Sequence, residues 1–181
     1  MSPLLTTLIL LLAGAFFAWT MIRRVVPLLA LRRVDRLDRP GERIEGLLRF
    51  GFGQRRMVDP EELRPGVMHV VIFAAFLVLG VRTLTLFGMG FAEGFHLPLL
   101  APESPVGLGY AFVKDVMVLA ALAAALGFLW RRLVTRPDRI TLSWEGTLIL
   151  GFIAGLMVTD MLFDGAGMIA SAEPLSWWAP A

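Results

Sequence analysis

Four long apolar stretches alternate with polar segments along the 181-residue chain. They run from about Pro3 to Ile22, Val67 to Phe91, Val106 to Trp130 and Ile140 to Phe163. A helix rises about 1.5 Å per residue, so each stretch is long enough to cross the roughly 30 Å hydrocarbon core of a bilayer. The pattern predicts an all-α fold, an integral membrane helical bundle of four transmembrane helices within a single transmembrane domain, residues 1–181.

The loop 23–66 is polar but contains one patterned part. Asp38-Arg39-Pro40-Gly41-Glu42 is a turn and helix-start signal. Apolar residues then recur at helical spacing between charged ones: Ile44, Leu47, Leu48 and Phe52. This pattern predicts one amphipathic cytoplasmic helix lying on the membrane face. The alternative is a plain linker that only sets the topology.

The sixteen arginines indicate how the helices are oriented. Eleven fall between Arg23 and Arg64 and four more between Arg131 and Arg139, whereas the segment 92–105 contains neither Lys nor Arg. Because cytoplasmic loops of membrane proteins are enriched in these residues, both arginine-rich segments are expected in the cytoplasm. The chain is therefore predicted to be a multi-pass protein of the cytoplasmic (inner) membrane, with both termini outside.

Composition supports this class and excludes several others. Charged residues make up 18% of the chain, below the roughly one quarter typical of soluble domains. The pI of about 9.9 could indicate a nucleic-acid partner, but the arginines border apolar segments, so no nucleic-acid partner is expected. The chain has no cysteine and so can form neither a disulfide nor a cysteine-ligated iron–sulfur cluster.

Polar residues inside the predicted spans are the first functional candidates, because charge is costly in a membrane. Arg82, Lys114, Asp115 and Asp160 lie on three helices at similar depth towards the outer face, and Asp164 follows one turn beyond the predicted fourth span. They could be structural ion pairs, with the two cations neutralised by Asp115 and Asp160. They could also line a pocket for haem carboxylates or a quinone head group, and the two interpretations are compatible.

The two histidines could bind haem iron, since neutral imidazoles hold membrane b-type haems. His69 lies at the cytoplasmic start of the second span among apolar and aromatic residues, although a lone histidine there can also be simply interfacial. His96 lies in the outer loop, roughly 30–40 Å away along the helix axis. The two imidazoles cannot bind the same iron, so a second ligand would have to come from other sequence.

The remaining motifs are weaker evidence for structure or function. Gly88-Met89-Gly90 is typical of a helix end, and Gly151 with Gly155 forms a spacing suited to close helix packing. No motif of a hydrolase or NTPase is visible. A transporter is disfavoured because there is neither an inverted repeat nor a pair of broken helices.

Several runs of the chain resemble one protein family, the membrane-bound iron–sulfur oxidoreductases of the heterodisulfide-reductase-like type. The N-terminal membrane portion of that family is similar to the gamma subunit of respiratory nitrate reductase. The runs are Arg39–Arg43, Phe50–Met57, His69–Gly80, Arg82–Gly88, Phe95–Leu99 and Met157–Asp160.

The resemblance implies electron transfer between a cytoplasmic donor and membrane quinone. It implies a helical bundle that holds b-type haem, with His69 as a ligand of the haem iron and His96 as a ligand or a quinone-site residue. Arg82, Lys114 and Asp160 would lie near the haem propionates or the quinone. Some members of the family accept electrons from electron-transfer flavoprotein.

This chain departs from the family because it lacks the cysteine-rich part that carries iron–sulfur clusters. We therefore expect it to be the N-terminal part of a longer protein, or to work with a cytoplasmic iron–sulfur domain or subunit, and not to be active alone as an oxidoreductase. The alternative is a non-redox membrane anchor or assembly subunit, surrounded by lipid, whose intramembrane ion pairs are structural.

Overall fold

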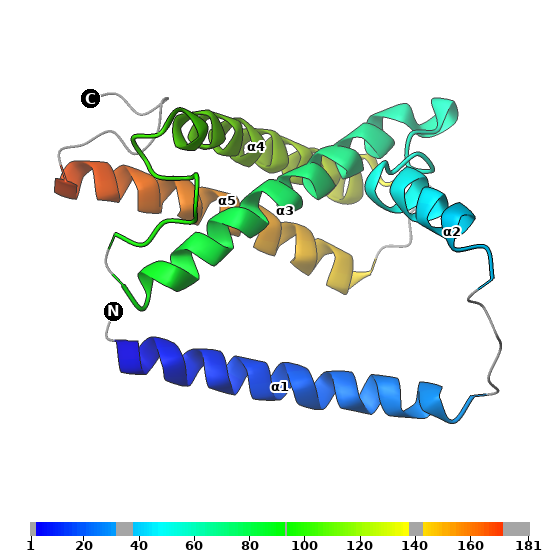
Figure 1. The fold of residues 1–181 in the computed structure, drawn as a ribbon. Helices are drawn as coiled ribbons and strands as arrows, with labels where there is room; N and C mark the ends of the chain where they lie inside the picture. The colour runs from blue at the N-terminus through cyan, green and yellow to red at the C-terminus, as the bar shows by residue number, and fades with distance from the viewer. Residues whose placement is uncertain (1–2, 32–37, 93, 138–142, 172–181) are drawn as a thin grey trace.

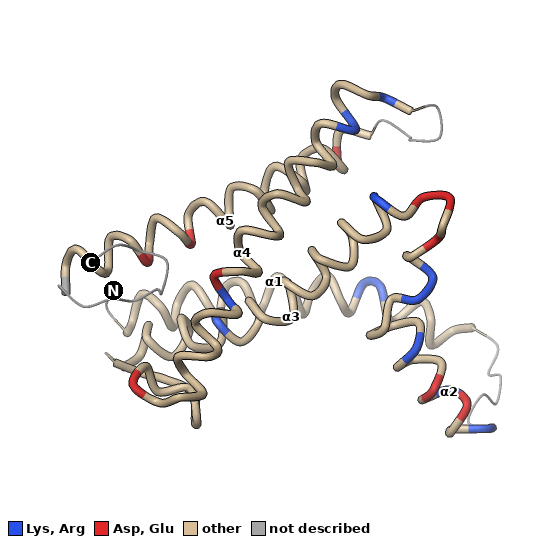
Figure 2. The backbone as a smooth tube through the Cα atoms, turned by 90° about the horizontal axis from the view of Figure 1, so that it is seen from above, with Lys and Arg blue, Asp and Glu red and all other residues tan. Residues whose placement is uncertain are grey.

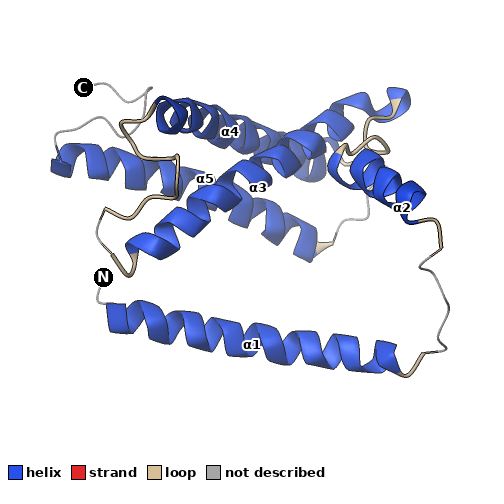
Figure 3. Ribbon diagram, in the orientation of Figure 1, coloured by secondary structure: helices blue, strands red, loops and turns tan. Residues whose placement is uncertain are grey.

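The computed structural model describes residues 3–31, 38–92, 94–137 and 143–171, and these form helices and connecting segments without a strand (Figure 3). Four helices are long and apolar enough to cross a membrane. They are α1 (Pro3–Leu29), α3 (Leu63–Met89), α4 (Pro105–Trp130) and α5 (Trp144–Ser171), arranged as Figure 1 shows. The predicted all-α fold with four spans is confirmed.

Shorter helical turns occupy the polar segments. The helix α2 (Pro40–Gly46) continues directly into a π-helical turn, η1 (Leu47–Phe52), and a 3-10 turn, η2 (Pro60–Glu62), leads into α3. A second π-helical turn, η3 (Arg131–Thr135), prolongs α4. The predicted amphipathic segment is thus helical, and its apolar side chains are exposed, as a helix on a lipid surface requires. Its contact with lipid stays a prediction.

The helix α4 is the centre of the bundle and packs against both α3 and α5. Apart from Lys114 and Asp115, its buried residues are Gly, Ala and Val. The apolar core joins Ala75 of α3, Val118 and Ala121 of α4, and Met157 of α5. Small residues at helix contacts let the backbones approach closely, which is how membrane helices gain packing energy.

The helix α1 lies apart from the other three long helices in Figure 1, and Thr6 is its one buried residue. A Cβ atom added to Gly90 would lie 2.7 Å from Thr6 Cγ2, so α1 approaches the end of α3 at this point. Most of the remaining α1 side chains are apolar and exposed, which is stable in hydrocarbon rather than in water.

The two ends of the helical bundle differ in their content of charged residues (Figure 2). We call the end formed by 55–64 and 131–136 the arginine-rich end, where Arg131 Nη2 lies 2.7 Å from Glu62 Oε2. We call the opposite end, formed by the described residues of 92–104, the loop end. The long helices run between these two ends, and most of their length carries no charge.

Three sequence-based expectations differ from the structure. The first span was predicted to end at Ile22, but α1 continues to Leu29, since long arginine side chains can reach an interface from inside a helix. The fourth span was predicted to end at Phe163, but α5 continues to Ser171, because the charge of Asp164 is neutralised. Gly151 and Gly155 have open space around them, so this pair packs against nothing in the described part of the chain.

Candidate functional site

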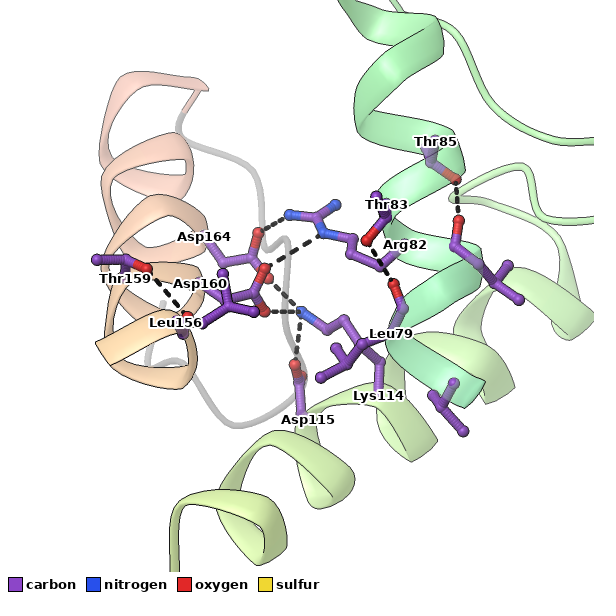
Figure 4. Close-up of polar contacts among 12 residues, drawn as sticks. Leu79, Arg82, Thr83, Thr85, Lys114, Asp115, Leu156, Thr159, Asp160 and Asp164 are labelled. Carbon is purple, nitrogen blue, oxygen red and sulfur yellow. Dashed lines mark hydrogen bonds and ion pairs between the residues drawn. The ribbon is translucent and has the colours of Figure 1, made fainter. Parts of the chain in front are cut away.

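Five charged side chains from three helices form one network inside the bundle (Figure 4). Asp164 of α5 accepts hydrogen bonds from both Arg82 of α3 and Lys114 of α4. Lys114 Nζ also lies 2.7 Å from Asp115 Oδ1. Asp160 is held more loosely, 3.6 Å from Arg82 Nε and 3.9 Å from Lys114 Nζ. The ion pairs that the sequence predicted for Arg82 and Lys114 are therefore present, and Asp164 joins them.

The helices bring these groups together by simple spacing. Asp160 and Asp164 are one turn apart, so both carboxylates lie on one face of α5. Arg82 lies in the second half of α3, whereas Lys114 and Asp115 lie in the first half of α4, which runs in the opposite direction. All three helices therefore present their charges in the half of the bundle nearer the loop end.

The network is deeply buried. Lys114, Asp115 and Asp164 are 4%, 2% and 3% exposed, and the side chains of Arg82 and Asp160 are 18% and 12% exposed. A buried charge is tolerated only when it is paired and hydrogen-bonded, and removing one partner of such a pair typically costs about 3–5 kcal/mol. Each of the five groups here has an oppositely charged group within 4 Å.

A cavity of about 240 Å³ adjoins the network at the loop end. Its polar and aromatic lining comes from α3, from the segment 94–102, from α4 and from α5: Arg82, Thr85, Phe95, His96, Tyr110, Lys114, Phe163 and Asp164. Arg82, Lys114 and His96, all predicted site residues, thus share one cavity. Asp160 is not among the lining residues but is paired to two of them, Arg82 and Lys114.

The connection between α3 and α4 folds back over the bundle and forms one wall of this cavity. Gly88 permits this, because a Cβ atom there would lie 1.9 Å from Phe95 Cδ1. Gly107 permits a second close approach, since its Cβ atom would lie 2.0 Å from the Ala101 carbonyl oxygen. Ser104 caps α4, its Oγ accepting a hydrogen bond from the Gly107 amide at 2.9 Å. These contacts fix His96 at the cavity.

The cavity combines hydrogen-bond donors with aromatic walls. Arg82 and Lys114 are cationic donors. Neutral His96 has one ring N–H, which either Nδ1 donates to the Leu97 carbonyl oxygen at 3.4 Å or, in the other tautomer, Nε2 can donate to a ligand. The Arg82 guanidinium carbon lies 5.7 Å from the centre of the Phe163 ring, within cation–π range. The Tyr110 hydroxyl donates to the Val78 carbonyl oxygen at 3.0 Å, which ties α4 to α3 beside the cavity. Such a site suits a flat, partly polar ligand with acceptor oxygens.

Two titratable residues of the cavity lining were missed by the sequence-based predictions. Asp164 was placed outside the membrane, although its spacing from Asp160 on a helix is a readable signal. Tyr110 carries no sequence signal beyond being the one tyrosine of the chain. Its position at the cavity depends on the packing of α4 against α3, which a sequence pattern does not reveal.

His69 lies far from this cavity. It is in the second turn of α3 at the arginine-rich end, about 30 Å in helix length from Met89, where α3 ends. Its side chain is exposed, and the two histidines of the chain lie at opposite ends of the bundle. Binding of a b-type haem by His69 therefore stays a prediction, because His96, the other histidine of the chain, lies at the opposite end.

Comparison with known proteins gives two curated relatives. The probable iron-sulfur-binding oxidoreductase FadF of Bacillus subtilis (strain 168) is 27% identical over 139 residues, which are 77% of this chain and 19% of that protein. The EtfAB:quinone oxidoreductase of Syntrophomonas wolfei subsp. wolfei (strain DSM 2245B / Goettingen) is 27% identical over 150 residues, which are 81% of this chain and 20% of that protein. No family model matches, and no solved structure matches significantly.

These similarities support a relationship to iron–sulfur oxidoreductases. The chain spans about a fifth of the length of the curated relatives it matches. Similarity to the gamma subunit of nitrate reductase and the binding of haem stay predictions.

Proposed function

We propose that this chain is the membrane electron-transfer domain of a quinone-linked oxidoreductase, and that the cavity at the loop end binds the quinone head group. The observation that carries the proposal is the cavity itself, with Arg82 and Lys114 in its lining and apolar membrane-length helices around it. Its volume is below the roughly 300–1,000 Å³ of drug-sized ligand sites, which suits a single substituted ring better than a porphyrin.

The residues of the cavity would act by binding and by electrostatics. His96 would donate a hydrogen bond to one quinone carbonyl oxygen, and Arg82 or Lys114 to the other. Reduction places negative charge on these oxygens, and fixed cations in a dry site stabilise such charge strongly. Phe95 and Phe163 would provide apolar contact for the ring.

The wider assembly is part of the same proposal. Electrons would arrive at the arginine-rich end from a cytoplasmic iron–sulfur domain or subunit, with electron-transfer flavoprotein as its donor. The relative named EtfAB:quinone oxidoreductase supports this link. Arginine enrichment supports a cytoplasmic position for that end, and hence both termini outside the inner membrane.

A b-type haem, when bound, would supply one-electron transfer between the two ends. His69 would supply one ligand to its iron. In the complex purified from its native membrane, His69→Ala should remove the b-type bands from the reduced-minus-oxidised visible spectrum, whereas His96→Ala should retain them. Bands that survive His69→Ala would refute this assignment.

A non-redox anchor is the second candidate, and one observation favours it. Each cation of the network already has a carboxylate partner within the chain, so the network can be structural without any ligand.

Quinone binding separates the two candidates. A short-chain quinone titrated into the purified chain in lipid nanodiscs should bind. His96→Ala should weaken this binding roughly two- to tenfold, which is the effect expected from the loss of one hydrogen bond. His69→Ala is the matched control, since it removes an exposed imidazole at the other end, and it should leave binding unchanged. Absence of quinone binding, or equal effects of both variants, would favour the anchor.

A further inference from the structure

The charges of the buried network do not balance. Arg82 and Lys114 contribute two positive charges, whereas Asp115, Asp160 and Asp164 contribute three negative ones. With all five groups ionised, the network would carry a net charge of 2 − 3 = −1. The other titratable groups that line the adjoining cavity are Tyr110, whose hydroxyl donates to a backbone carbonyl, and His96.

An unbalanced charge in this position must be compensated. The network lies within helices of membrane length, where a net charge is expensive. A bound metal ion is a poor solution, because no group of three or more acidic or histidine side chains in the described residues could hold one. A proton on one carboxylate neutralises the network without any further ligand.

The contacts identify which carboxylate holds this proton. Asp164 accepts from both cations, and Asp115 lies 2.7 Å from Lys114 Nζ, so both gain most from being ionised. The nearest cationic nitrogens to Asp160 are 3.6 and 3.9 Å away, and its side chain is the most exposed of the three carboxylates. We propose that Asp160 is a proton-binding site that holds one exchangeable proton in the resting protein at neutral pH.

The position of Asp160 gives this proton a route to the cavity. Lys114 lies between them, since it contacts Asp160 on one side and lines the cavity on the other. The Lys114 ammonium can give a proton to a ligand oxygen and take the Asp160 proton in its place. The ligand then gains one proton, and the network has a net charge of −1 until it takes up another. This second step, unlike the proton site itself, rests on the proposed quinone function.

Infrared spectroscopy tests the proton site with no quinone present, so its outcome is independent of the proposed function. The purified chain in lipid nanodiscs should show the carbonyl stretch of a protonated carboxylic acid at neutral pH, shifted by exchange into D₂O. Asp160→Asn should abolish this band, because the network is then neutral with two charges of each sign. Glu103→Gln, a matched change in the exposed loop, should retain it.

Thermal unfolding serves as the control for folding. Asn resembles a protonated Asp in shape and charge, so Asp160→Asn should melt at nearly the temperature of the unmodified protein. A band that persists in a folded Asp160→Asn protein would overturn the assignment to Asp160. Absence of any protonated-carboxyl band at neutral pH in the unmodified protein would overturn the proposal altogether.

Discussion

Asp164 is the side chain on which both buried cations converge. It accepts from Arg82 and from Lys114, and it is 3% exposed. Because α3 and α4 each supply one of these cations, this single carboxylate of α5 connects all three packed helices. Its loss would leave Arg82 with Asp160 at 3.6 Å as its nearest carboxylate, whereas Lys114 would keep Asp115 at 2.7 Å.

Asp164→Asn should therefore lower the free energy of unfolding by about 3–5 kcal/mol, the usual cost of breaking a buried ion pair. Glu62→Gln is the matched control. It also breaks an ion pair, to Arg131 at 2.7 Å, but the Glu62 side chain is 40% exposed, so its cost should stay below about 1 kcal/mol. Denaturation of the purified variants in detergent measures both. Equal losses of stability would show that the buried network does not hold the helices together.

Much of this network could be predicted from single residues. Charges inside apolar stretches stand out, and counting depth along oppositely directed helices placed Arg82, Lys114, Asp115 and Asp160 at one level. The place of Asp164 in the network was not predicted, because an aspartate at the edge of an apolar stretch lowers the local hydropathy and indicates the end of a span. Its neutralisation depends on cations from two other helices, which no local pattern reveals.

Among the elements, the connection between α3 and α4 matters most for the site. It is held by close contacts at Gly88 and Gly107, and it brings Phe95 and His96 to the cavity. The apolar pattern predicted the helices well, since length and hydrophobicity are local properties. The path of this connection was not predictable, because it is set by contacts between residues of different elements.

Gly88→Ala tests the role of this connection. The added Cβ atom would lie 1.9 Å from the Phe95 ring, so the ring must move and the cavity wall with it. Such overpacking costs about 1–3 kcal/mol, and quinone affinity should fall by about tenfold or more. Gly80→Ala is the control on the same helix, where nothing lies within 4 Å, and it should leave affinity unchanged. Unchanged affinity in Gly88→Ala would mean that Phe95 does not shape the binding site.

At the scale of the whole molecule, the two ends have separate chemistry. The arginine-rich end carries His69, whereas the loop end carries the cavity with its buried charges. The sequence predicted this separation from the distance between the two histidines. The position of α1 was less predictable, because Thr6, which approaches the end of α3, is its one buried residue and most of its other side chains are apolar, exposed and suited to lipid.

Photoaffinity labelling with an azido-quinone tests whether the cavity at the loop end binds the quinone head group. The purified chain in lipid nanodiscs would be illuminated with the probe, digested and sequenced by mass spectrometry. Labels are expected in peptides that contain 94–111 and Phe163, and they should disappear with excess unlabelled quinone. Labels spread over the lipid-facing surface of α1, or labels at the cavity that unlabelled quinone fails to displace, would contradict it.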